Sequence, residues 1–117
     1  MVQTVKILLA DDNDDLRMLY RIMLSEFTVI QAVNGNEAVA FYKKHKPDLV
    51  LMDILMPIKD GIEATKEIIE FDPKATIIAI TAYSSKAENI LLAGAKQVIK
   101  KPFRRIELIE IIVQELQ

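Results

Sequence analysis

Acidic, hydroxyl-bearing and basic side chains come directly after four short apolar runs of this chain. They are Asp11, Asp12, Asp53, Thr81 and Lys101. Three carboxylates in one crevice would repel one another, and a hard divalent cation removes that repulsion. Mg²⁺ takes oxygen ligands and usually keeps several waters, so two carboxylates and a backbone carbonyl suffice to bind it. The acidic residues therefore predict a magnesium site if the fold brings them together, with Mn²⁺ as an alternative cation.

A carboxylate beside such a cation can also attack a phosphorus centre and form an acyl phosphate. The transferring phosphoryl group needs its negative charge stabilised on all its oxygens. The cation would serve one oxygen and the Lys101 ammonium a second. The Thr81 hydroxyl, together with backbone N–H groups after Asp53 and Thr81, would serve the third. This set of residues predicts phosphorylation of an aspartate.

Five apolar segments, predicted to be strands, alternate with five amphipathic segments, predicted to be helices. The strands are expected at 5–10, 27–32, 48–53, 75–81 and 97–100, and the helices at 16–24, 37–45, 62–71, 86–93 and 105–117. Such alternation favours a parallel sheet covered on both faces and wound by right-handed crossovers. Its ligand site lies beyond the carboxyl ends of the strands. Of the five predicted strands, only the one that ends at Ala32 brings no polar side chain to this edge. Asp14 and Asp15, at the start of the first predicted helix, are expected to cap that helix.

Composition limits the class of protein. The 117 residues predict a single domain spanning 1–117, and 51% hydrophobic with 27% charged residues is typical of a soluble globular fold. No apolar run approaches the roughly 18 residues that cross a bilayer. The absence of cysteine excludes disulfides and thiolate metal sites and is compatible with a cytoplasmic location. A net charge of −2 gives no overall attraction to nucleic acid or to an anionic membrane.

The motifs resemble those of the receiver domain of two-component response regulators, of the single-domain chemotaxis or phosphorelay type. They are DD at 11–12, DILMP at 53–57, DG at 60–61, TA at 81–82 and KPF at 101–103. The resemblance covers essentially the whole chain, and each motif follows the appropriate predicted strand. It implies a flavodoxin-like, doubly wound (βα)5 three-layer sandwich with a five-stranded parallel sheet in the order 2-1-3-4-5.

The same resemblance implies a role for each matching position. Asp53 looks like the phosphoacceptor, and Asp12 like a direct Mg²⁺ ligand. Asp11 would hold waters of the metal, and the backbone carbonyl of Leu55 would complete the protein ligands. Thr81 would hydrogen-bond the phosphoryl group and move toward it as the switch.

The resemblance further implies that Lys101 pairs with the phosphoryl group and that the bond before Pro102 is cis. The phosphoryl donor would be a histidine kinase or a histidine phosphotransfer protein, and a downstream protein target would read the phosphorylated surface. Such a chain is not an enzyme in the usual sense, because it only phosphorylates and dephosphorylates itself. We expect a monomer or a phosphorylation-dependent dimer, without direct contact to nucleic acid or membrane.

Three positions depart from the pattern of the family. Val98 stands where an aromatic switch partner is usual, so either Tyr83 substitutes for that ring or Val98 is ordinary strand packing. Leu55 and Tyr83 would flank the phosphoryl group, and both are bulky and uncharged. Because neither side chain easily orients an attacking water, we expect a comparatively long-lived phosphoryl group.

Three other functions remain to be weighed. A phosphohydrolase with an aspartate nucleophile would need a second acid two residues after Asp53, where this chain has Leu55. A flavin mononucleotide carrier would need a glycine- and hydroxyl-rich loop, where this chain has the acidic segment 11–15. The chain could also be the receiver part of a longer DNA-binding regulator.

Overall fold

The computed structural model of the chain describes residues 4–82 and 84–117. In these residues the strands are β1 (Lys6–Ala10), β2 (Thr28–Ala32), β3 (Leu49–Asp53), β4 (Ile77–Thr81) and β5 (Gln97–Lys100). The helices are α1 (Asp14–Met23), α2 (Gly35–His45), α3 (Gly61–Phe71), the short 3-10 helix η1 (Ser84–Lys86), α4 (Ala87–Ala93) and α5 (Arg105–Glu115). Tyr83, the predicted neighbour of the phosphoryl group, lies outside the described residues.

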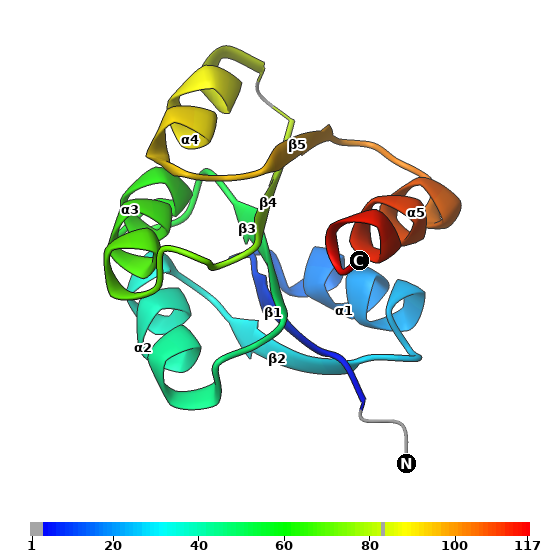
Figure 1. Cartoon of the computed structure of the whole chain (residues 1–117). Helices are drawn as coiled ribbons and strands as arrows, with labels where there is room; N and C mark the ends of the chain where they lie inside the picture. Colours follow the sequence, from blue (N-terminus) through cyan, green and yellow to red (C-terminus); the bar gives the residue numbers. More distant parts are fainter. Residues whose placement is uncertain (1–3, 83) are drawn as a thin grey trace.

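The five strands form one parallel sheet in the order β2-β1-β3-β4-β5. Helices α1 and α5 cover one face of it, and α2, α3 and α4 cover the other (Figure 1). The predicted flavodoxin-like fold class and strand order are therefore confirmed. No helix in the described part of the chain combines the length and the apolar character that a membrane crossing requires.

Two apolar cores lie on opposite faces of the sheet because successive strand residues point to opposite sides. Leu8 and Val50 pack with residues of α2, α3 and α4, whereas Ile7 and Leu51 pack with residues of α1 and α5. Every residue of β3 and β4 is buried, which explains why these segments are apolar without alternation. Burial of each large aliphatic side chain contributes about 1.5–3 kcal/mol. The two strands that end in Asp53 and Thr81 are thus buried along their whole length.

The helices after β1, β2 and β3 begin close to the carboxyl edge of the sheet, and each has a side-chain cap. Asn13, Asn34 and Asp60 accept a backbone N–H from the first turns of α1, α2 and α3, respectively. The prediction that Asp14 and Asp15 cap α1 is wrong, because the capping residue is Asn13. Asn13 has the extended backbone that a capping residue needs, whereas Asp14 and Asp15 lie in the first turn, where they complement the helix dipole.

Candidate functional site

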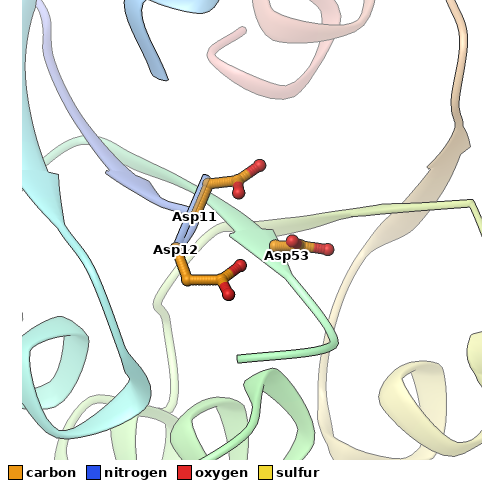
Figure 2. A group of neighbouring side chains, drawn as sticks. All are labelled: Asp11, Asp12 and Asp53. Atoms are coloured by element: carbon orange, nitrogen blue, oxygen red, sulfur yellow. The ribbon is translucent and has the colours of Figure 1, made fainter. Parts of the chain in front are cut away.

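The three predicted carboxylates meet at the carboxyl edge of the sheet. Asp11 and Asp12 follow β1, and Asp53 ends β3, the strand paired with β1. One carboxylate oxygen from each residue lies within 4.8 Å of the others. Figure 2 shows the three side chains leaving the adjoining ends of the two strands. The parallel pairing of β1 and β3 therefore brings together residues that are far apart in the sequence.

Lys101 completes the charged cluster from the other half of the sheet. Its Nζ lies 3.3 Å from Asp11 Oδ2 and 3.5 Å from Asp53 Oδ2. The backbone N–H of Lys101 donates to the carbonyl oxygen of Thr81 at 2.9 Å, which joins the ends of β5 and β4. The peptide bond between Lys101 and Pro102 is cis, as the resemblance implied.

Three further predicted site residues are not members of this charged cluster. Thr81 is buried at the end of β4, the strand paired with β3. Leu55 lies in the loop after β3 and is 45% exposed. Val98 lies in β5 opposite Ala79 and is half-buried against the core formed with α2, α3 and α4. Thr81 thus ends the strand beside β3, and Leu55 follows Asp53 by two residues, whereas Val98 is placed as a packing residue.

Burial, together with the neighbouring Asp11 carboxylate, raises the pKa of the Asp53 carboxyl from 3.8 to about 6. The Lys101 ammonium and the backbone N–H of Ile54, which donates to Asp53 Oδ1 at 2.8 Å, act in the opposite direction. One ammonium thus faces three carboxylates, and the cluster has a surplus of negative charge. A bound divalent cation would remove this surplus.

The donor set fits a hard cation such as Mg²⁺, because the clustered groups are all carboxylate oxygens. Asp12 is exposed and Asp53 is 9% exposed, so water and a small anion can reach the cluster from solvent. An anion that approached Asp53 would meet the Lys101 ammonium. The arrangement can therefore bring a cation and an anionic group to the same carboxylate.

The family model of the response regulator receiver domain matches residues 7–113. This chain belongs to the response regulator receiver domain family. Receiver domains of the CheY type are signalling proteins and not conventional enzymes. The chemotaxis protein CheY of Halobacterium salinarum is 47% identical to this receiver over 111 residues, covering 92% of each chain.

Two solved structures that are similar to this receiver contain magnesium. One is a complex of CheX, CheY, BeF3 and Mg²⁺ from Borrelia burgdorferi, whose matched chain is 36% identical with a TM-score of 0.84 over 94% of this chain and 87% of that chain. The other is the magnesium-bound receiver domain of the sensor histidine kinase PA1611 from Pseudomonas aeruginosa. It is 32% identical with a TM-score of 0.91 over 97% of this chain and 98% of that chain. Similar receivers thus bind Mg²⁺, and this one has an acidic cluster of suitable chemistry.

The receiver contains two residues around the cluster that sequence reasoning did not single out. Tyr20, buried in α1, has its pKa raised to about 12 by burial and by the nearby charges of Asp11 and Asp53. Arg17, also in α1, donates from Nη1 to the backbone carbonyl oxygen of Asp11 at 2.6 Å. Tyr20 packs in the core between the sheet and helices α1 and α5. A contact between a side chain and a carbonyl, such as that of Arg17, has no sequence signature.

Two backbone positions shape the loop after β3. The N–H of Gly61 donates to the carbonyl oxygen of Ile54 at 2.8 Å, and a Cβ at Gly61 would overlap the carbonyl oxygen of Asp53. Glycine is required there by this close approach. Ile58 has a φ of 72°, in the left-handed region that β-branched residues rarely adopt. The loop that carries Leu55 is therefore closed tightly at Gly61 and strained at Ile58.

Proposed function

We propose that this receiver accepts a phosphoryl group on Asp53 in a Mg²⁺-dependent reaction and thereby switches a protein-interaction surface. The observation that carries the proposal is the convergence of three carboxylates within 4.8 Å, with Lys101 Nζ 3.3 and 3.5 Å from two of them. An acidic cluster alone would suit a cation. The added ammonium provides a partner for the anion that a phosphorylated aspartate becomes.

In this proposal Asp12 and Asp53 are direct ligands of Mg²⁺, and Asp11 holds waters of the ion. The backbone carbonyl of Leu55 is the remaining protein ligand. Bound Mg²⁺ would supply charge neutralisation for the phosphoryl oxygens, and Mn²⁺, which accepts the same oxygen donors, would replace it. The surplus negative charge of the cluster supports this assignment.

The chemical step begins with attack of the Asp53 carboxylate on the phosphorus of a phosphohistidine. The P–N bond breaks as the O–P bond forms, and the histidine nitrogen keeps the bonding electron pair and takes up a proton. Lys101 turns from Asp11 and Asp53 toward the new phosphoryl oxygens. The Thr81 hydroxyl donates to the same group, for which its place at the end of β4 is suitable.

The partners follow from the family. The donor is a histidine kinase or a histidine phosphotransfer protein in the cytoplasm, and the output is a downstream protein target. A similar CheY was solved together with CheX, which illustrates a protein partner of a receiver. Movement of Thr81 toward the phosphoryl group biases the loops after β3 and β4. Because position 98 is a valine packed against the core, the switch here works without an aromatic ring at that position.

Acetyl phosphate in the presence of Mg²⁺ tests the phosphoacceptor directly. The wild-type chain should gain one phosphoryl mass by intact mass spectrometry, and chelation of Mg²⁺ should prevent the gain. Asp53→Asn should remove it, whereas Asp15→Asn, which changes an exposed aspartate of α1, should not. An Asp53→Asn protein that still gained the phosphoryl mass would overturn the assignment.

A further inference from the structure

The guanidinium of Arg17 is unusually well held for a side chain near a helix start. The side chain is only 11% exposed, although it lies one turn into α1. Nη1 donates to the carbonyl oxygen of Asp11 at 2.6 Å, and Nε donates to Gln31 Oε1 at 3.3 Å. Nη2 forms an ion pair with the carboxylate of Asp14. All three nitrogens are therefore engaged, with partners after β1, in β2 and in α1.

The contact with Asp11 is the informative one. The carbonyl of Asp11 belongs to the peptide unit that joins Asp11 to Asp12, and this unit is planar. Fixing that carbonyl therefore fixes the orientation of the peptide between the two acidic residues, whose side chains leave the backbone in different directions (Figure 2). Arg17 thus acts on the residues of the cluster through their backbone.

Other hydrogen bonds hold the same short segment, and from α1 the N–H of Leu16 donates to Asn13 Oδ1 at 3.0 Å. The Arg17 side chain is the contact from α1 to the carbonyl of Asp11. The N–H of Asp11 donates to the carbonyl oxygen of Ala32 at 3.1 Å, and the N–H of Asn13 donates to Asp11 Oδ1 at 2.9 Å. These bonds fix the N–H and the carboxylate of Asp11. The Arg17 bond fixes its carbonyl, and so determines where Asp12 begins.

We propose that Arg17 is a positioning residue of the metal site, which holds the Asp11–Asp12 peptide so that both carboxylates face Asp53 before a cation arrives. This inference rests on the proposed Mg²⁺-dependent function. A charged donor to a backbone carbonyl in a nearly buried position is stronger than an exposed ion pair. The arrangement corresponds to the outer-shell contacts that orient metal ligands, whose loss typically weakens metal binding 10- to 100-fold.

A purely electrostatic effect of Arg17 would have the opposite sign. The guanidinium is a positive charge close to a cation site, so its removal would by itself strengthen Mg²⁺ binding. The Asp14 carboxylate, paired with Arg17, offsets much of that charge. We therefore expect the loss of positioning to dominate and Mg²⁺ binding to weaken.

The test measures Mg²⁺ affinity by isothermal titration calorimetry for the wild type, Arg17→Met, Arg17→Lys and Arg21→Met. Arg17→Met keeps much of the aliphatic stem and should weaken binding about tenfold. Arg17→Lys keeps the charge but loses the planar fork, and should also weaken binding. Arg21→Met, which removes an exposed arginine one turn further along α1, is the matched control and should bind as the wild type does.

A second measurement works without metal. In the Arg17 variants, the amide of Asn13 should exchange its hydrogen faster than in the wild type, because the peptide that precedes it is less firmly held. Circular dichroism and thermal unfolding verify that each variant folds, and Arg17→Lys decides the matter if Arg17→Met does not fold.

The outcomes separate the two proposals. Unchanged or tighter Mg²⁺ binding in both Arg17 variants, with a wild type that binds Mg²⁺, would overturn the positioning role and leave the proposed function intact. A wild type that binds no Mg²⁺ would refute the proposed function. In that case, unchanged Asn13 exchange in the variants would refute the positioning of the Asp11–Asp12 peptide as well.

Discussion

The metal-free receiver should become more stable when the charge of Asp53 is removed. Raising the pKa of this carboxyl from 3.8 to about 6 means that its ionised form is disfavoured in the folded state. Each pKa unit corresponds to about 1.4 kcal/mol, so the penalty is about 3 kcal/mol above pH 6. Because the side chain is 11% exposed, water reduces the penalty, and we expect Asp53→Asn to raise the free energy of unfolding by about 1–2 kcal/mol at pH 8.

The stabilisation expected from Asp53→Asn depends on pH, and the raised pKa of Asp53 fixes the direction of that dependence. Between pH 4 and 6 the folded protein keeps the Asp53 proton more readily than the unfolded chain does. The contribution of this group to stability therefore falls as the pH rises through that window. Asparagine does not titrate, so the advantage of Asp53→Asn should be full above pH 6 and should disappear below pH 4.

Urea denaturation in the presence of a chelator, at pH 8 and at pH 3.5, measures the difference. Asp15→Asn is the control, and it should lose a few tenths of a kcal/mol through its weaker interaction with the N-terminus of α1. Mg²⁺ at a hundredfold excess over its dissociation constant should stabilise the wild type by about 2.7 kcal/mol and Asp53→Asn by much less. An Asp53→Asn protein no more stable than the wild type at pH 8 without metal would refute the reasoning.

Three further substitutions concern the loop after β3. Leu55→Asn should shorten the lifetime of the phosphorylated protein, because an amide can orient a water that leucine cannot; an unchanged or longer decay time would contradict this. Gly61→Ala should lower the free energy of unfolding in urea by at least about 2 kcal/mol, since its Cβ would overlap the Asp53 carbonyl oxygen, and a near-neutral effect would show that the loop can yield. Ile58→Asn should raise the free energy of unfolding by about 0.5–1 kcal/mol, because asparagine tolerates a φ of 72° and Ile58 is 78% exposed. Ile58→Val, which remains β-branched, should bring no such gain.

Periodicity predicted which faces are apolar but not how completely they are covered. Leu19 in α1 is 44% exposed and Ile106 in α5 is 58% exposed, although both are apolar. The sheet offers only a limited area to α1 and α5, and Tyr20, Leu24, Leu108 and Ile112 occupy it. An apolar side chain at the border of a helical stripe is covered only where a neighbouring element reaches it.

The sequence by itself determined the class of fold and the members of the acidic cluster. Apolar strands alternating with amphipathic helices require a covered parallel sheet, and parallel strands bring all their carboxyl ends to one edge. The positions of Asp11, Asp12, Asp53 and Lys101 at the ends of three such strands therefore sufficed to predict that they meet. The family resemblance added the strand order and the cis bond before Pro102, which the structure has.

Only the tertiary structure decided the properties that depend on distance and burial. The raised pKa of Asp53 arises from burial at the end of a central strand and from the Asp11 carboxylate beside it. The contact from Arg17 to the Asp11 carbonyl depends on the angle at which α1 leaves β1. The choice of Asn13 as the cap of α1 depends on where the chain turns from extended to helical backbone. Such quantities are set by several elements at once, and no local pattern of residues encodes them.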